Sequence, residues 1–405
     1  MLKFAKGKPL GEDGFKWLKI HLINLTGTMK RNSLDERAQH ADEIMDDIID
    51  SAENPLEGKA WWRQSDEPWQ TLACCMEIRD VIKSGVDPRD YVTSFPVHQD
   101  GSCNGLQHYA ALGRDLEGAN SVNLVPSSIP SDVYSDVAAR VEWDRIEDAR
   151  KGVEIAQLLE GRVGRKVVKT TVMTYVYGVT LFGAKLQIFK NIKDLKDFPE
   201  EHRWKASLYL TEKVFASILK MFKSTKAIQD WLTQISVGVS RNLNLPVEWI
   251  TPLGLPVIQP YLTKDVPAEL ESKSRKTRVK VNSLKQKNGF PPNYIHSLDS
   301  SHMMLTALFC ERQGITFVSV HDSFWTHPCD VNRMNIICRQ QFVNLHSQNL
   351  LQDLSDFFIK NYSVQNSDRQ RSKERTTELI QLFRQVPAKG SFQLENVLKS
   401  TYFFS

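Results

Sequence analysis

Two aspartates that lie far apart in the chain have surroundings that suit metal-dependent phosphate chemistry. Asp100 follows a β-rich run at residues 91–97, and Asp322 stands between two short β-rich runs, 316–320 and 323–326. Carboxylates at adjacent strand ends can share two divalent ions roughly 3.5–4 Å apart, an arrangement that stabilises the attacking and leaving oxygens in phosphoryl transfer. Magnesium suits such a pair because it needs only one or two protein carboxylates. Each aspartate alone is more often a turn or cap residue, so the hypothesis depends on the pair.

A predicted helix that begins at Arg165 offers a second set of side chains. Arg165, Lys169, Met173 and Tyr177 recur every four residues, which puts them on one face of the helix. The two cations could hold a triphosphate, and the phenol could hydrogen-bond a sugar while its ring lies against a base. The simpler interpretation is structural: the cationic start of the helix is exposed to solvent, and the rest of this face packs against the core. Gly178 marks the predicted end of the helix.

A third candidate is His296, which lies in the segment 292–299. A lone histidine beside apolar residues is usually structural, so His296 gains a role only together with the other two segments. A basic run without acids comprises Lys273, Arg275, Lys276, Arg278, Lys280, Lys285 and Lys287. Such a run is usually a solvated loop, and a loop that contacts phosphates is the alternative.

The rest of the sequence predicts the elements that position these residues. Residues 1–115 are mostly helical and end in a strand, a turn and a helix, with Asp100 at the turn. Ser33 and Glu36 have the spacing of a capping box, which predicts the start of an amphipathic helix. Helical periodicity is strongest in four stretches: 132–163, 165–177, 204–238 and 298–312. The two β-rich runs that follow predict a hairpin with Asp322 at its bend.

Composition excludes several classes of protein. The 405 residues are 41% hydrophobic and 25% charged, and no apolar run is long enough to span a membrane, which excludes disordered, collagenous and membrane-spanning proteins. The net charge is only +4, so affinity for a polyanion must come from local patches. The six cysteines lack the spacing of a zinc site or disulfide framework, which favours a reducing compartment. The first residues resemble neither a signal peptide nor a transit peptide, so an import address would lie outside this chain.

Three tryptophans, Trp61, Trp62 and Trp69, are predicted to be packing anchors around a loop. Stacking of exposed rings on nucleic-acid bases is the alternative.

Three segments together resemble the catalytic motifs of the single-subunit, phage-type RNA polymerases, and most closely those of the animal mitochondrial branch. They are DGSCNGLQH at 100–108, RKVVKTTVMTYVYG at 165–178 and HDSFWT at 321–326. Further similarity to the mitochondrial branch lies at 69–76, 288–293 and 400–405. The resemblance covers nearly the whole chain, and three ordered motifs are far more specific than any one of them.

The resemblance implies an α+β, predominantly helical right-hand polymerase. The palm would comprise residues 1–115, with the first motif, and 296–405, with the third motif and a C-terminal foot. The fingers would comprise residues 116–295, with the nucleotide-binding helix and the basic loop. The family's thumb and N-terminal domain are expected to be absent from this chain.

The resemblance also implies roles for the residues near the phosphates. Asp100, Asp322 and the backbone carbonyl of Gly101 would bind two Mg²⁺ ions. Arg165 and Lys169 would hold the incoming triphosphate, with Lys169 as general acid toward pyrophosphate.

Other residues would recognise the sugar and the template. Tyr177 and His296 would sense the ribose 2′-hydroxyl, Tyr177 would also close the insertion site, and Met173 would share the nucleotide-binding face. Tyr134 would lie near the template strand. At Gly105, related DNA polymerases carry a bulky acidic side chain, so the glycine would leave room for a ribose.

The function implied is DNA-directed RNA synthesis, in which a nucleotidyltransferase adds NTPs to an RNA 3′-hydroxyl in the mitochondrial matrix. Its partners would be a DNA template, nascent RNA, NTPs, and mitochondrial initiation and elongation factors. One alternative is a catalytically silent fragment that binds nucleic acid or a partner, because the thumb is missing. A DNA polymerase is disfavoured by Gly105 and His296.

Overall fold

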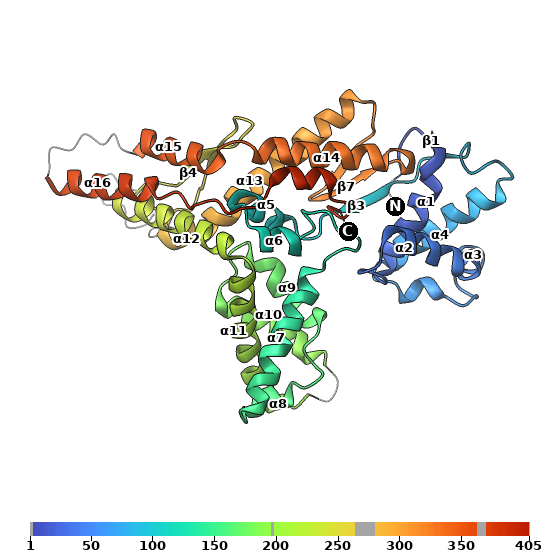
Figure 1. The fold of residues 1–405 in the computed structure, drawn as a ribbon, viewed down its shortest axis with the longest axis horizontal. Helices are drawn as coiled ribbons and strands as arrows, with labels where there is room; N and C mark the ends of the chain where they lie inside the picture. Colours follow the sequence, from blue (N-terminus) through green and yellow to red (C-terminus); the bar gives the residue numbers. More distant parts are fainter. Residues whose placement is uncertain (1–2, 196–197, 264–279, 363–369, 405) are drawn as a thin grey trace, which may run out of the picture.

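The computed structural model describes residues 3–195, 198–263, 280–362 and 370–404, and it is mainly helical with a few short strands (Figure 1). This confirms the predicted fold class. An elongated central body carries one lobe at its right-hand end and a second lobe below it, and both chain ends lie near β3. In the described part of the chain, no helix combines the length and the apolarity needed to cross a bilayer.

The right-hand lobe, here called the N-terminal lobe, is built from the first elements of the chain (Figure 1). These are β1 (Lys8–Pro9), α1 (Gly11–Thr26), α2 (Leu34–Glu43), α3 (Met45–Glu53), η1 (Trp61–Gln64), α4 (Pro68–Lys83) and β2 (Val92–Thr93). α2 begins at the predicted capping box, because the Ser33 side chain accepts from the Glu36 backbone N–H and the Glu36 side chain accepts from the Ser33 backbone N–H. The lobe has its own apolar core, to which α1 contributes Leu18 and α4 contributes Ile78.

The predicted packing role is confirmed for Trp61 and Trp62 and is wrong for Trp69. Trp61 packs against the core of the lobe, and the buried Trp62 donates its indole N–H to the Pro55 carbonyl at 2.9 Å. Trp69 remains 74% exposed, although its ring centre lies 5.1 Å from that of Trp62. The buried face of α4 includes Thr71 and Cys75, and the helical period turns residue 69 away from that face.

The lower lobe contains the helices that surround the candidate nucleotide-binding segment. They are α7 (Val133–Arg150), α8 (Glu154–Leu158), α9 (Arg165–Tyr175), α10 (Leu181–Lys193), η2 (Glu200–His202) and α11 (Arg203–Met221). The predicted helical stretches 132–163 and 165–177 are confirmed, and the first is divided after α7, where Gly152 adopts a φ of +83°.

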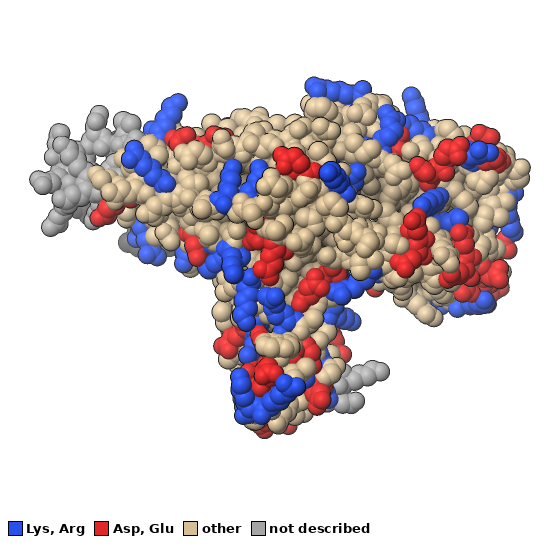
Figure 2. All heavy atoms as spheres, in the orientation of Figure 1, with Lys and Arg blue, Asp and Glu red and all other residues tan. Residues whose placement is uncertain are grey.

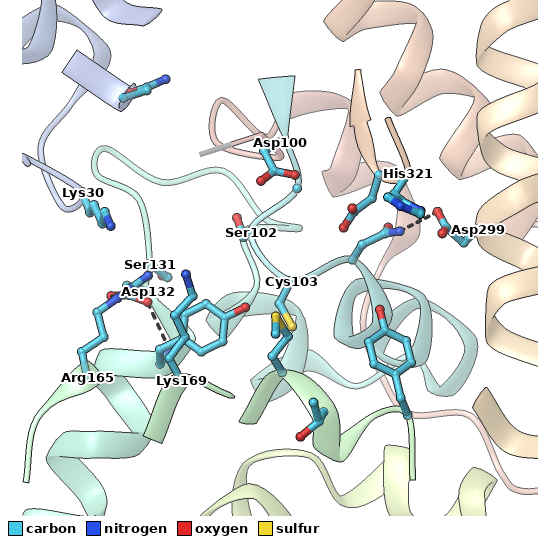
Figure 3. Close-up of a pocket in the computed structure, with 18 of the residues that line it drawn as sticks. Lys30, Asp100, Ser102, Cys103, Ser131, Asp132, Arg165, Lys169, Asp299 and His321 are labelled. Carbon is cyan, nitrogen blue, oxygen red and sulfur yellow. Dashed lines mark hydrogen bonds and ion pairs between the residues drawn. The ribbon is translucent and has the colours of Figure 1, made fainter. Parts of the chain in front are cut away.

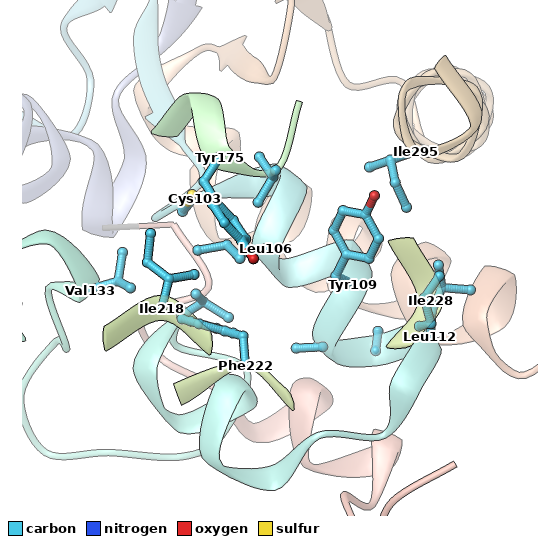
Figure 4. Packing of buried hydrophobic residues seen from close by; sticks show 14 of the residues in the cluster. Cys103, Leu106, Tyr109, Leu112, Val133, Tyr175, Ile218, Phe222, Ile228 and Ile295 are labelled. Carbon is cyan, nitrogen blue, oxygen red and sulfur yellow. The ribbon is translucent and has the colours of Figure 1, made fainter. Parts of the chain in front are cut away.

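The central body contains the remaining elements. They are β3 (Val97–Asp100), α5 (Asn104–Gly113), α6 (Leu116–Ser121), α12 (Lys223–Val237), the π-helical turn η3 (Gly238–Leu243), β4 (Glu248–Ile250), β5 (Pro256–Ile258), α13 (Ser283–Arg312), β6 (Val318–Val320), β7 (Ser323–Thr326), η5 (Pro328–Asp330), α14 (Val331–His346), α15 (Leu350–Tyr362), α16 (Gln370–Arg384) and η6 (Leu394–Lys399). Every residue of α5 is buried. Figure 4 shows Tyr109 of α5 near Ile228 of α12 and Ile295 of α13, and all three belong to the larger of the two apolar cores in the described part of the chain.

A three-stranded antiparallel sheet in the order β3–β7–β6 holds both candidate aspartates. Asp100 is the last residue of β3, rather than part of the turn, and it pairs with Ser323. Ser323 also pairs with Val320, so His321 and Asp322 form the bend of the β6–β7 hairpin. The predicted hairpin with Asp322 at its bend is therefore confirmed, and His321 adopts the positive φ of +56° that such tight bends favour.

The helix predicted near 298–312 is longer than its sequence suggests. α13 begins at Ser283 and contains Pro291 and Pro292, which hide its first half because proline usually interrupts a helical pattern. His296 consequently lies within a long helix.

Part of the basic run can be located. Lys285 and Lys287 lie in the first turns of α13, and Lys280 precedes it. Lys273, Arg275, Lys276 and Arg278 lie outside the described residues.

Charges of both signs are interspersed over the face of the molecule in Figure 2, and much of the central body carries neither sign there. That face has no continuous basic surface, as expected from the small net charge.

Candidate active site

A pocket of about 750 Å³ lies where the central sheet, α9, α13 and the connection between α1 and α2 meet (Figure 3). Nine candidate site residues from the sequence line it: Asp100, Gly101, Tyr134, Arg165, Lys169, Met173, Tyr177, His296 and Asp322. Gly105 is not among the lining residues. The fold therefore brings five separate parts of the sequence, 100–101, 134, 165–177, 296 and 322, into one concave surface.

The carboxylates of Asp100 and Asp322 lie close enough to influence each other. The pKa of Asp100 is raised to about 6, first because the pocket walls displace water from its charged form and second because of the charge on Asp322. Lys169 acts in the opposite direction by favouring the carboxylate. A cation beside the two aspartates would relieve their repulsion.

The oxygen atoms of these aspartates suit a hard cation whose remaining ligands come from water or from substrate. Carboxylate oxygens are ligands that Mg²⁺ prefers. Among the residues described, no three His, Cys, Asp or Glu side chains are grouped around a single metal position. Gly101 lines the same pocket and pairs with Phe404 in an isolated β-bridge.

The first two turns of α9 direct two cations into the pocket. Arg165 donates from Nε to Asp132 Oδ2 at 2.7 Å, and its guanidinium lies 5.0 Å from the centre of the Tyr134 ring. Lys169 Nζ lies 5.9 Å from the same ring centre. Burial, followed by the positive charges of Arg165 and Lys30, lowers the pKa of Lys169. The pocket therefore weakens the hold of Lys169 on its proton.

Tyr134 forms the floor beneath these cations. It lies in the first turn of α7, where the Asp132 side chain accepts from the Tyr134 backbone N–H at 3.2 Å. The Tyr134 side chain is buried, and burial raises the pKa of its hydroxyl. Its ring thus supports Arg165 and Lys169 as a neutral surface.

Tyr177 follows α9 and stands between two other helices. α9 ends at Tyr175, and Gly178 turns the chain with a φ of +74°. The Tyr177 ring stacks on His296 with centres 4.6 Å apart and planes inclined by 27°. Burial raises the pKa of Tyr177, so its hydroxyl keeps its proton at neutral pH and can donate.

Gly105 of α5 lies against the other side of Tyr177. A Cβ at position 105 would come within 2.8 Å of Val176 Cγ2 and 3.2 Å of the Tyr177 hydroxyl. The absence of a side chain therefore has a packing reason in the protein itself: it allows Tyr177 to approach α5.

Some pocket residues were not singled out from the sequence. Asp299 lies three residues after His296 on α13, accepts a hydrogen bond from Asn104 Nδ2 at 2.5 Å and has a pKa raised to about 6, mainly by burial. The i, i+3 spacing from His296 was a usable signal, but the prolines concealed that the two residues share a helix. Lys30 and Arg37 reach the pocket from the N-terminal lobe, and no local pattern indicates this.

The chain is similar in sequence to known proteins. A family model described as DNA-dependent RNA polymerase matches residues 8–405. The chain is 56% identical over 415 residues to the mitochondrial DNA-directed RNA polymerase of Mus musculus, covering 100% of this chain and 34% of that protein. The corresponding protein of Homo sapiens is 55% identical over 413 residues, with 100% and 33% covered. DNA-directed RNA polymerase 2, chloroplastic/mitochondrial, of Arabidopsis thaliana is 43% identical over 417 residues, with 100% and 40% covered. The chain thus spans about a third of the length of the two animal relatives.

Proposed function

The chain belongs to the DNA-dependent RNA polymerase family, and from that premise we propose that it catalyses DNA-templated RNA synthesis in mitochondria. Its relatives in mouse and human are named as mitochondrial DNA-directed RNA polymerases. The observation that carries the proposal is that Asp100 and Asp322, from distant parts of the chain, line one pocket together with the cations of α9. The reaction is the transfer of a nucleotidyl group from an NTP to an RNA 3′-hydroxyl.

The carboxylates of Asp100 and Asp322 are the proposed ligands of two Mg²⁺ ions, with the Gly101 carbonyl as a further ligand. Their oxygen donors and their mutual repulsion support this assignment. When bound, the ions would activate the 3′-hydroxyl and neutralise the charge that develops on the leaving pyrophosphate.

Arg165 and Lys169 are the proposed triphosphate ligands, and Met173 shares their side of the pocket. The hydrogen bond to Asp132 uses Nε of Arg165, so the terminal amino groups are the ones that would meet a phosphate. The lowered pKa of Lys169 suits donation of a proton to the pyrophosphate oxygen as the P–O bond breaks.

Tyr177 and His296 are the proposed sensors of the ribose 2′-hydroxyl. The protonated phenol can donate to that hydroxyl, and the stacked imidazole holds the ring in place. Tyr134, beneath the cations, is the proposed contact to the template base. Base choice would come mainly from pairing with the template.

In this proposal residues 1–115 and 296–405 form the palm and residues 116–295 form the fingers. The partners are a DNA template, nascent RNA, NTPs, and the mitochondrial initiation and elongation factors, and the compartment is the mitochondrial matrix. These assignments rest on the family and on the names of the relatives.

A primed template with Mg²⁺ tests the proposal directly. The purified chain is expected to extend an RNA primer with the templated NTP and to prefer it to the corresponding dNTP. Binding of the duplex without extension would instead support a catalytically silent fragment. Preferential extension with dNTPs would support a DNA polymerase.

A further inference from the structure

A narrow slot between two helices holds the ring of Tyr177. One wall is α5 at Gly105, where a Cβ would come within 3.2 Å of the Tyr177 hydroxyl. The other wall is α13 at His296, whose ring stacks on Tyr177. The position of the phenol therefore depends on the spacing between α5 and α13.

A hydrogen bond links these two walls beside the slot. Asn104, next to Gly105 in α5, donates from Nδ2 to Asp299 Oδ1 at 2.5 Å. Asp299 stands one turn after His296 on α13, and both line the pocket. In Figure 3 a dashed line marks this bond at the labelled Asp299, which lies on the same side of the pocket as His321. The Asn104–Asp299 hydrogen bond thus ties α5 beside Gly105 to α13 beside His296, and Gly105 and His296 are the residues that contact Tyr177 from either side.

Two buried side chains of α5, Asn104 and His108, lie near the Asp299 carboxylate, and they differ in their distance from it. The Asn104 side chain is buried, and the Asp299 side chain is 23% exposed. His108, one turn after Asn104 on α5, is fully buried with Nε2 at 3.9 Å from Asp299 Oδ1, too far for a hydrogen bond. His108 Nδ1 is instead within 2.9 Å of His346 Nε2. Of the two buried neighbours Asn104 and His108, Asn104 is therefore the one within hydrogen-bond distance of Asp299 Oδ1.

We propose that Asp299, through its hydrogen bond with Asn104, is a positioning residue that sets the width of the slot and thereby the selectivity for ribose over deoxyribose. This inference deepens the proposed function and rests on it. Asp299 acts by fixing the distance between Gly105 and His296. This distance holds the Tyr177 hydroxyl in one position relative to the sugar of the bound nucleotide. A loosened slot would let the phenol move, and the contribution of the 2′-hydroxyl would fall.

Four variants separate the hydrogen bond from the charge. Asp299→Ala removes the acceptor, and Asn104→Asp sets two carboxylates against each other. Asp299→Asn keeps an acceptor without the charge. The double variant Asn104→Asp with Asp299→Asn restores one donor and one acceptor with their places exchanged. Asp356→Ala, an exposed acid on α15 that accepts from Gln352, is the matched control.

The measurement is the ratio of kcat/KM for an NTP to that for the matching dNTP on a primed template. The ratio does not depend on the fraction of active protein, so partial unfolding cannot imitate the effect. Loss of one positioning hydrogen bond is expected to lower the ratio about tenfold in Asp299→Ala and in Asn104→Asp. Asp299→Asn, the double variant and the control should stay within about twofold of wild type.

Equilibrium binding gives a readout that does not need turnover. ATP and dATP are titrated onto the protein with a template and a primer that lacks its 3′-hydroxyl. If the wild-type chain extends no primer but prefers ATP in binding, and Asp299→Ala removes that preference, the proposed activity fails and the positioning role stands. If the wild-type chain extends with NTPs and Asp299→Ala keeps the full preference in both assays, the positioning role is overturned and the activity stands.

Discussion

In the proposed mechanism, single residues in the pocket divide into those that would handle phosphate charge and those that would handle the sugar. Asp100, Asp322, Arg165 and Lys169 belong to the first group, and Tyr177, held between Gly105 and His296, belongs to the second. Because the two groups lie on different elements, their contributions to catalysis can be separated by substitution.

Replacing Tyr177 by phenylalanine removes the donor hydroxyl and keeps the ring that stacks on His296. The preference for NTP over dNTP is expected to fall about tenfold, the effect of one lost hydrogen bond, with little change in kcat for the NTP. Steady-state single-nucleotide addition measures both values. Tyr209→Phe is the control, since the Tyr209 hydroxyl donates to Asp148 in the lower lobe. An unchanged preference in Tyr177→Phe would remove its role in sugar selection.

The pKa of Asp100 predicts a pH-dependent stability of the metal-free protein. This pKa is raised from 3.8 to about 6 on folding, so the group's contribution to stability is fully present below pH 3.8 and is lost as the pH rises through 6. Asp100→Asn removes the ionisation, so the Tm of the variant should rise relative to that of wild type as the pH increases from about 4 to about 7, and the difference should then stay constant. Thermal melts in a chelator measure the difference. Parallel Tm profiles for the two proteins would contradict the shifted pKa.

The sequence allowed nine of the pocket residues to be identified, seven of them because they lie in three compact motifs. Asp299 was missed although it lies in the segment 292–299, which carries His296. Its role depends on Asn104, which lies far away in the sequence, and hydrogen bonds between distant segments leave no trace in local spacing. The exposure of Trp69 was also missed, because aromatic residues pack more often than they stand free.

At the scale of elements, the site depends on where strands and helices end. Asp100 ends β3, the bend between β6 and β7 carries Asp322, and Tyr177 follows the last turn of α9. The hairpin and α9 were predictable from their short-range patterns. The start of α13 was not, because two prolines within a helix are tolerated only through tertiary packing, which the local sequence does not reveal.

Gly178 provides a test of the turn that follows α9. Its φ of +74° is unfavourable for alanine, so Gly178→Ala should lose about 1–2 kcal/mol of stability and displace Tyr177. Gly152→Ala, at a φ of +83° with no atom within 4 Å of the added Cβ, should lose a similar amount of stability. Denaturant melts and primer extension are measured together. The expectation is that only Gly178→Ala loses activity beyond its loss of folded protein, and equal activity of the two variants would contradict it.

At the scale of the whole molecule, the pocket collects residues from both lobes and from the central body. Lys30 and Arg37 of the N-terminal lobe line the pocket opposite elements that lie much later in the chain. Arg31 also pairs with Asp136 of α7 at 2.7 Å, which links the two lobes directly. The order of motifs predicted the family, but this arrangement of the lobes depends on long-range contacts that no local pattern encodes.

The segment that contains Phe403 and Phe404 pairs with the chain directly after β3, the strand that carries Asp100. Phe404 forms a β-bridge with Gly101, and its ring centre lies 5.8 Å from that of Phe324 in β7. Phe404→Ala should therefore cost about 3–5 kcal/mol and impair activity by loosening the position of Asp100. Leu398→Ala, at a 42% exposed position in η6, is the control and should change stability little. Equal stability of the two variants in urea unfolding would contradict this supporting role.

The central claim, that Asp100 and Asp322 act together in nucleotidyl transfer, is tested most directly by single-nucleotide extension of an RNA primer in Mg²⁺. Asp100→Asn and Asp322→Asn are compared with wild type and with Asp356→Asn, an exposed acid on α15 that lies outside both motifs and does not line the pocket. Each of the first two variants is expected to lose activity about a thousandfold or more while keeping a cooperative melt, because an amide cannot replace a carboxylate as a ligand of Mg²⁺. The Asp356 variant should match wild type. Extension at the wild-type rate by either Asp100→Asn or Asp322→Asn would contradict the claim.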